Sequence, residues 1–215
     1  MYITYNTMDF TILNKTISLV AKRNSGKSVL LKYLVQEEIQ NFKKILVICP
    51  TKFNGFYDDW IDPNCIFEDY NEEWVEKLIS KMSKINQGKN NDTADHILLI
   101  LDDCCSDTRF HGSPSLKKLF SRGRHSFCSI IITCQMMHHI PPLCRSNSDF
   151  LLVGQLNNQN LDLLCDEFRT GLEKKDFKKM YTRLTTNYSF LIINNNSVKK
   201  SDDLNSLYAS IKAKI

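Results

Sequence analysis

Short, nearly continuous apolar runs alternate along the chain with longer segments of mixed polarity. A run of four to eight apolar residues bounded by turn residues is typical of a buried strand. Six such runs predict strands, at residues 16–20, 44–49, 96–101, 129–134, 149–154 and 188–193. The segments between them predict helices at about 27–41, 72–86, 114–120, 157–168 and 172–182, with Ser113 as the cap of the third.

This alternation of strands and helices predicts an α/β fold whose sheet is mostly parallel and flanked by helices. The 215 residues are expected to form a single domain over 1–215. Residues 1–15 are expected to be an N-terminal arm or strand, and residues 203–215 an amphipathic C-terminal helix. Residues 53–70 are aromatic and rich in turn residues. We expect an irregular segment packed on the sheet there, and a platform for stacking bases is the alternative.

A phosphate-binding loop is predicted between the first strand and the first helix, because strand, loop and helix in this order are the context that such a loop needs. Backbone N–H groups at a helix N-terminus bind phosphate, and the helix dipole favours negative charge there. Lys27 is expected to reach the β- and γ-phosphates of a nucleotide, and the Ser28 hydroxyl to bind Mg²⁺. The predicted nucleotide-binding residues are Ala21, Lys22, Arg23, Asn24, Ser25, Gly26, Lys27 and Ser28.

Two positions of this loop depart from the usual glycines. Ala21 stands where the consensus begins with glycine, and it fits only if the backbone keeps a negative φ there. Asn24 stands at another position where glycine is common, and asparagine tolerates the left-handed region better than most residues. A chance Gly-Lys-Ser sequence in a turn is the alternative to a functional loop.

The apolar run at 96–101 ends in two acids, Asp102 and Asp103, which is the Walker B pattern. A buried strand would carry Asp102 to the phosphate loop, where it would hold Mg²⁺ directly or through water. Asp103 would then face the γ-phosphate and polarise or orient the attacking water. The alternative is that both acids cap the following turn.

Three further residues are candidates for catalysis. Gln135 follows the strand at 129–134 and could touch both the γ-phosphate and the attacking water, or it could be an ordinary turn residue. Arg124, and Arg122 as the second choice, could act in trans by completing the active site of a neighbouring subunit and neutralising charge on the transferred phosphoryl group. Both arginines could instead be surface cations or bind DNA.

Composition limits the function classes only loosely. The net charge of +4 is compatible with nucleic-acid binding without indicating it. The eight cysteines contain no Cys-x-x-Cys pair, which favours free, buried thiols over a zinc site or a disulfide framework. No apolar run is long enough to span a bilayer, and the first residues do not have the pattern of a signal peptide.

Taken in order, these motifs resemble those of the viral genome-packaging ATPases of the FtsK–HerA superfamily, which include the poxvirus-type packaging ATPases. The resemblance rests on the phosphate loop, the Cys49-Pro50-Thr51 strand end with Trp60 beyond it, Leu101-Asp102-Asp103, the spacing from Arg122 to Gln135, and Arg145-Ser146-Asn147 before Asp149. It implies a RecA-like core of the ASCE type, hydrolysis of ATP with Mg²⁺, and a homo-oligomeric ring, pentameric or hexameric.

The resemblance also implies translocation of double-stranded DNA into a capsid, contact with capsid or vertex proteins, and a location in the virion or in a viral factory of the host cytoplasm. DNA would be gripped through its phosphates, without sequence readout. Arg109, in the segment 106–112 after the Walker B acids, is the first candidate for this contact, with Lys117 and Lys118 assisting. A small P-loop kinase and a nucleotide-binding assembly scaffold with little turnover are the alternatives.

Overall fold

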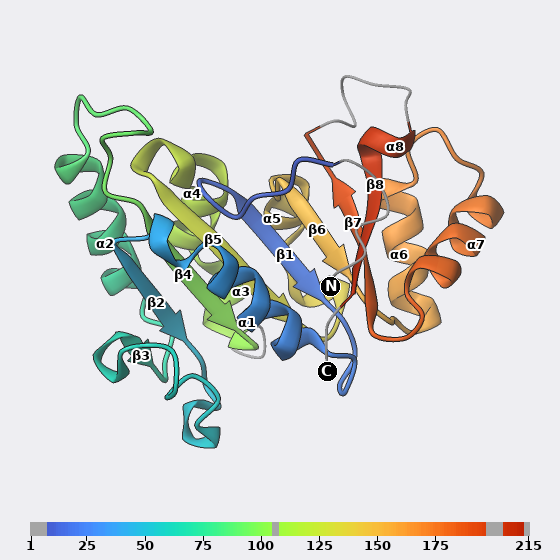
Figure 1. Cartoon of the computed structure of the whole chain (residues 1–215), viewed down its shortest axis with the longest axis horizontal. Helices are drawn as coiled ribbons and strands as arrows, with labels where there is room; N and C mark the ends of the chain where they lie inside the picture. Colours follow the sequence, from blue (N-terminus) through green and yellow to red (C-terminus); the bar gives the residue numbers. More distant parts are fainter. Residues whose placement is uncertain (1–7, 105–107, 197–203, 213–215) are drawn as a thin grey trace.

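The computed structural model describes residues 8–104, 108–196 and 204–212. Their strands form one eight-stranded sheet in the order β3-β2-β4-β5-β1-β6-β7-β8 (Figure 1). The strands are β1 (Thr16–Val20), β2 (Lys44–Ile48), β3 (Ile66–Phe67), β4 (Ile97–Asp102), β5 (Cys128–Cys134), β6 (Phe150–Val153), β7 (Ser189–Asn194) and β8 (Tyr208–Lys212).

Strands β1 to β6 run parallel to one another, whereas β7 pairs antiparallel with both β6 and β8 at one edge of the sheet. Strand β5 lies between β1 and β4, with Val20 opposite Cys134 and Asp102 opposite Thr133. The carboxyl ends of these three strands therefore meet at the same edge of the sheet, which is where ligands bind in open α/β folds.

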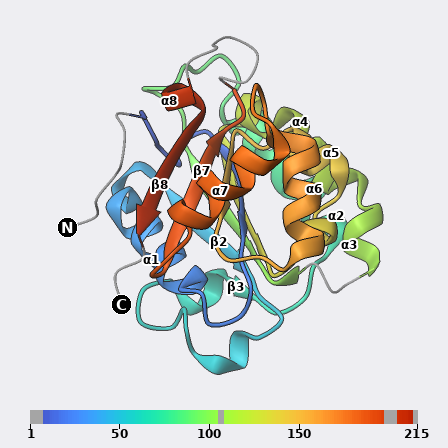
Figure 2. The ribbon, with the colours of Figure 1, turned by 90° about the vertical axis from the view of Figure 1, so that its right-hand side faces the viewer.

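Helices cover both faces of the sheet. Figure 2 shows α2, α4, α5 and α6 on one side of it and α1 on the other. The helices are α1 (Lys27–Glu37), α2 (Glu72–Ile85), α3 (Thr108–Gly112), α4 (Pro114–Arg122), α5 (Pro142–Ser146), α6 (Asn158–Phe168), α7 (Lys174–Leu184) and α8 (Leu204–Leu207). None of the helices that the structure describes has both the length and the apolar character needed to cross a bilayer.

The central strands read as continuous apolar runs because both of their faces are covered. Every residue of β1, β5 and β6 is buried, and so are the first five residues of β4.

The predicted cap of α4 is confirmed, since the Ser113 side chain accepts a hydrogen bond from the backbone N–H of Leu116 at the start of this helix. The seven cysteines that the structure describes are buried, and none of them is in a disulfide.

The predicted α/β fold with a mostly parallel sheet is confirmed, but the expected helix over 203–215 is wrong. Only Leu204–Leu207 is helical, and Tyr208–Lys212 forms strand β8, which pairs antiparallel with β7. At the other end of the chain, residues 8–15 contain no helix or strand, and residues 1–7 lie outside the described part.

The irregular segment at 53–70 contains one strand that the sequence did not predict. Strand β3 extends the sheet by pairing with β2, and the rest consists of two short 3₁₀ turns, other turns and bends. Phe56, Tyr57 and Trp60 pack against one another, whereas Phe53 is 85% exposed. Most aromatic rings of this segment therefore pack against the core, and they do not form a row of open rings.

Candidate functional site

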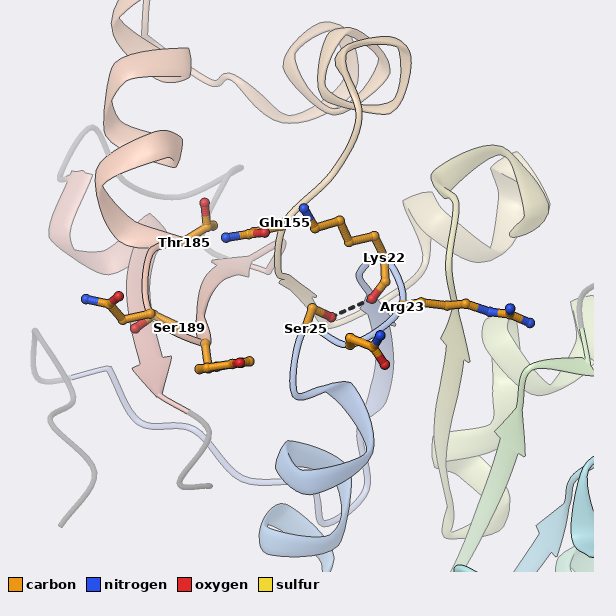
Figure 3. Close-up of a pocket in the computed structure, with 9 residues that line it drawn as sticks. Lys22, Arg23, Ser25, Gln155, Thr185 and Ser189 are labelled. Carbon is orange, nitrogen blue, oxygen red and sulfur yellow. Dashed lines mark hydrogen bonds between the residues drawn. The ribbon is translucent and has the colours of Figure 1, made fainter. Parts of the chain in front are cut away.

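The loop between β1 and α1 has the backbone conformation that its sequence predicts. Gly26, the residue before α1, has a φ of 85°, and Asn24 has a φ of 58°, so both are left-handed. The Ser25 hydroxyl donates a hydrogen bond of 2.6 Å to the backbone oxygen of Lys22, which closes the loop (Figure 3). Asn24 therefore takes the left-handed conformation for which glycine is usual.

Ala21, the residue in place of the first consensus glycine, is fully buried and is not among the residues with positive φ. Its methyl group faces Gly154, at the end of β6. A Cβ added at Gly154 would lie 2.8 Å from the Ala21 Cβ and 2.7 Å from the Phe190 ring. The Ala21 methyl group thus occupies the space that a side chain at position 154 would need, and Gly154 leaves that space open.

Three of the predicted catalytic residues come together at the carboxyl edge of the sheet. The Lys27 ammonium group forms an ion pair of 2.9 Å with one carboxylate oxygen of Asp103. The Gln135 amide donates a hydrogen bond of 3.4 Å to the other oxygen. Lys27 is only 8% exposed, so burial and an opposite charge hold its side chain in place beside the loop.

Asp102 is held by two hydroxyl groups. The Tyr57 hydroxyl donates to one carboxylate oxygen at 2.8 Å, and the Thr133 hydroxyl donates to the other. Thr133 also orients Asp103, whose backbone N–H donates to the Thr133 carbonyl at 3.2 Å and whose φ is 51°. Thr133, on β5, therefore positions both acids of the Walker B strand.

Tyr57 and Thr133 are site residues that the sequence did not predict. Tyr57 is 2% exposed, and burial together with the neighbouring Asp102 carboxylate raises the pKa of its hydroxyl. It therefore stays protonated and acts as a donor. Thr133, a polar residue opposite Asp102 directly after three isoleucines, was a possible sequence signal. Tyr57, in contrast, reaches Asp102 from a segment 45 residues away.

The expected Mg²⁺ ligands provide the chemistry that this ion requires. Ser28 is exposed in the first turn of α1, and its hydroxyl has no hydrogen-bond partner among the described residues. Asp102 is half-buried at the end of β4. Mg²⁺ binds oxygen ligands and usually keeps several waters besides one or two carboxylates and substrate phosphates. A hydroxyl and a carboxylate therefore fit it, although the described residues contain no group of three acidic, histidine or cysteine side chains suited to a metal.

The two predicted trans arginines lie elsewhere. Arg122 ends α4 and Arg124 lies in the 3₁₀ turn before β5, so both are at the amino edge of the sheet, opposite the phosphate loop. Both side chains are exposed. They do not reach the nucleotide site of their own subunit, so action in trans stays a prediction, with a role as surface cations or in DNA binding as the alternatives.

The predicted DNA-binding residues follow the Walker B strand. Arg109 belongs to α3, but its side chain lies outside the described part of the structure, as do residues 105–107. Lys117 and Lys118 are exposed on α4, and Lys118 lies 3.7 Å from Glu76 on α2. Their contact with DNA remains a prediction.

A cavity of about 470 Å³ adjoins the phosphate loop (Figure 3), and neither Asp103 nor Gln135 lines it. It lies between the loop and the turn that joins α7 to β7. Its lining residues are Lys22, Arg23, Asn24, Ser25, Gln155, Thr185, Asn187, Tyr188 and Ser189. In Figure 3, Lys22 and Ser25 face Thr185 and Ser189 across it, Gln155 lies between them, and the Arg23 side chain extends away.

Solved structures of other proteins share this fold. The solved structure of B204, the DNA-packaging ATPase from Sulfolobus turreted icosahedral virus, matches with a TM-score of 0.67 at 15% identity, covering 95% of this chain and all of that one. The complex of the packaging NTPase B204 of Sulfolobus turreted icosahedral virus 2 with AMPPCP matches with a TM-score of 0.62 at 16% identity, covering 94% and 98% of the two chains.

The relatives that are similar in sequence include the following two viral proteins. Protein 075L of Invertebrate iridescent virus 6, which is uncharacterised, is 29% identical over 190 residues, 87% of this chain and 73% of that protein. The DNA packaging protein OPG160 of Variola virus is 28% identical over 173 residues, 78% of this chain and 63% of that protein.

A family sequence model that covers more of the chain than either relative identifies the family. The sequence model of the poxvirus A32 protein matches residues 5–212, nearly the whole chain, and confirms the resemblance that the motifs predicted. The chain belongs to the poxvirus A32 protein family.

Proposed function

We propose that this protein is a Mg²⁺-dependent ATPase that drives double-stranded DNA into a viral capsid. The observation that carries the proposal is the meeting of Lys27, Asp103 and Gln135 beside a phosphate-binding loop. A basic residue at a helix N-terminus and a carboxylate at a strand end are the groups that phosphoryl transfer requires. Membership of the A32 family and the name of the OPG160 relative support packaging as the purpose of hydrolysis.

In this mechanism the triphosphate replaces Asp103 as the partner of Lys27. Lys27 and the N–H groups of the loop bind the β- and γ-phosphates, and Asp103, freed from its ion pair, orients the attacking water and accepts its proton. Gln135, already within hydrogen-bond distance of Asp103, holds the same water. Ser28 and Asp102 would hold Mg²⁺, which would neutralise charge on the phosphate oxygens of bound ATP.

The motor itself is expected to be a homo-oligomeric ring, pentameric or hexameric, that encloses the duplex and contacts capsid or vertex proteins in the virion or the viral factory. Hydrolysis at the interfaces between subunits couples assembly to catalysis. DNA contact through Lys117, Lys118 and Arg109 involves phosphates, so it is independent of sequence and weakens with salt.

Duplex DNA of any sequence is expected to stimulate ATP hydrolysis by the wild-type protein, because the grip on phosphates carries no base readout. Steady-state phosphate release with ATP and Mg²⁺, with and without duplexes of two unrelated sequences, measures this. Lys27→Ala is the matched control and is expected to lose hydrolysis under both conditions. Phosphorylation of a small acceptor in place of hydrolysis would support the kinase alternative, and packaging that persists in Lys27→Ala would support the scaffold.

Mixing two inactive variants is expected to restore hydrolysis if Arg124 acts in trans. Arg124→Ala keeps an intact Asp103, and Asp103→Asn keeps an intact Arg124. In a mixed ring, the site of an Arg124→Ala subunit can receive Arg124 from an Asp103→Asn neighbour. ATPase rates of the two variants alone and mixed at equal concentration test this.

Recovery of a substantial fraction of the wild-type rate on mixing is the expected outcome. Arg122→Ala, mixed in the same way, tests the second choice. Additive, near-zero rates in both mixtures, or a wild-type rate per subunit that is independent of protein concentration in a monomeric sample, would contradict a trans arginine.

A further inference from the structure

The Asp102 carboxylate already accepts hydrogen bonds at both of its oxygens. At Oδ2, the Tyr57 hydroxyl donates at 2.8 Å and the Cys49 thiol donates at 3.6 Å. At Oδ1, the Thr133 hydroxyl donates. An ionised carboxylate offers about four lone-pair positions, which its two oxygens share equally. Donors from the described residues thus occupy both positions of Oδ2, and the position that they leave open is on Oδ1.

Tyr57 is a rigidly held donor because its ring is enclosed. The residue is 2% exposed, and its ring lies 4.9 Å from the ring of Phe56 and 5.3 Å from that of Trp60. The Trp60 indole N–H donates to the Phe56 carbonyl at 2.8 Å. On the other side, the Lys32 ammonium group of α1 lies 5.7 Å from the centre of the Trp60 ring. These contacts fix the Tyr57 hydroxyl relative to both the carboxylate and the helix that follows the phosphate loop.

The number of open positions on a carboxylate affects which ion it can bind. Ca²⁺ takes about six to eight oxygen ligands and often binds both oxygens of one carboxylate. Mg²⁺ requires octahedral geometry, keeps several waters, and needs only one oxygen from each carboxylate. Asp102 cannot offer both oxygens to one ion unless Oδ2 gives up a donor that the packing of Tyr57 holds in place. The arrangement therefore suits Mg²⁺ better than Ca²⁺.

We propose that Tyr57 makes the nucleotide site selective for Mg²⁺ over Ca²⁺ by restricting Asp102 to one free oxygen. Tyr57 is thus a positioning residue, which acts through Asp102. The inference rests on the proposed function, which supplies the nucleotide and its ion. Hydrogen-bond partners of a metal ligand orient it and tune the affinity for the metal. Cys49 adds to the effect at the same oxygen but contributes less, because a thiol is a weak donor.

The test compares the binding of AMPPCP, a non-hydrolysable ATP analogue, in the presence of Mg²⁺, Ca²⁺ or EDTA. Isothermal titration gives the three dissociation constants, and the ratio of the first two is the ion preference. Tyr57→Phe removes only the hydroxyl and is expected to reduce the preference for Mg²⁺ on the order of tenfold, the scale of one hydrogen bond to a charged group. Its affinity in EDTA is expected to equal that of the wild type. Cys49→Ala is expected to reduce the preference by a smaller factor.

Tyr70→Phe is the matched control, because it also removes a buried tyrosine hydroxyl from the same part of the chain. Tyr70 is 5% exposed, and its hydroxyl hydrogen-bonds with Ser113 at 2.6 Å and donates to Glu72 at 3.4 Å, not to Asp102. This variant is expected to keep the ion preference of the wild type. If Tyr57→Phe does not fold, Cys49→Ala decides, since an unchanged preference in that variant overturns the proposal and a reduced one supports it.

The proposal is overturned if folded Tyr57→Phe keeps or increases the preference for Mg²⁺. It is equally overturned if this variant weakens AMPPCP binding by the same factor with Mg²⁺, Ca²⁺ and EDTA, because the hydroxyl then only supports the fold. A wild type that binds AMPPCP equally well with both ions contradicts this inference alone. A wild type that binds no AMPPCP under any of the three conditions contradicts the proposed function.

Discussion

Asp103→Asn is expected to reduce the steady-state rate of ATP hydrolysis by about 10²- to 10⁴-fold, the usual contribution of a positioned general base. The amide cannot accept the proton of the attacking water, although it keeps nearly the same shape. Lys27 loses its anionic partner in the free protein, so ATP binding is expected to persist or to strengthen. Phosphate release and ATP titration on the same sample separate the two effects.

Asparagine is compatible with the backbone conformation at position 103. A lower rate of hydrolysis can therefore be assigned to the lost carboxylate and not to a distorted backbone. Asp103 has a φ of 51°, and asparagine is among the residues that adopt this conformation most readily. Asp59→Asn, at an exposed aspartate, is the matched control and is expected to keep the wild-type rate. A folded Asp103→Asn protein that hydrolyses ATP at the wild-type rate would exclude Asp103 as the base.

Arg145→Leu is expected to lower the free energy of unfolding by about 1–3 kcal/mol, because it leaves the buried carbonyl groups of its partners without a donor and breaks an ion pair with the partly exposed Glu167. Arg145 is 4% exposed, and its guanidinium group donates to both carboxylate oxygens of Glu167 and to the backbone oxygens of Met137 and Ile140. It thereby ties α5 to α6 and to the turn after β5. Urea denaturation followed by circular dichroism measures the change.

Arg183→Leu provides the control, since Arg183 is exposed in the last turn of α7. A surface substitution of this kind is expected to change stability by no more than about 0.5 kcal/mol. Equal stabilities of Arg145→Leu and Arg183→Leu would show that the buried arginine contributes no more than a surface one. The motif Arg145-Ser146-Asn147 would then need a functional rather than a structural explanation.

The sequence determined the fold class and the centre of the site. Continuous apolar runs identified the buried parallel strands, because a strand covered on both faces has no reason to alternate. The phosphate loop and the Walker B acids each follow such a strand, and parallel strands carry their carboxyl ends to one edge of the sheet. This is why Lys27 and Asp103 meet although they are 76 residues apart.

Only the tertiary structure decided which groups surround that centre. Tyr57 reaches Asp102 from an irregular segment, and Tyr188 lines the cavity from a turn. Neither residue lies in a periodic sequence pattern that would have predicted this position. The same holds for the last strand. Residues 204–212 have apolar positions that suit a helix or a strand, and pairing with the open edge of β7 satisfies the backbone of 208–212 as a strand. Local pattern fixes which residues are buried, whereas contacts between distant segments fix what they are buried against.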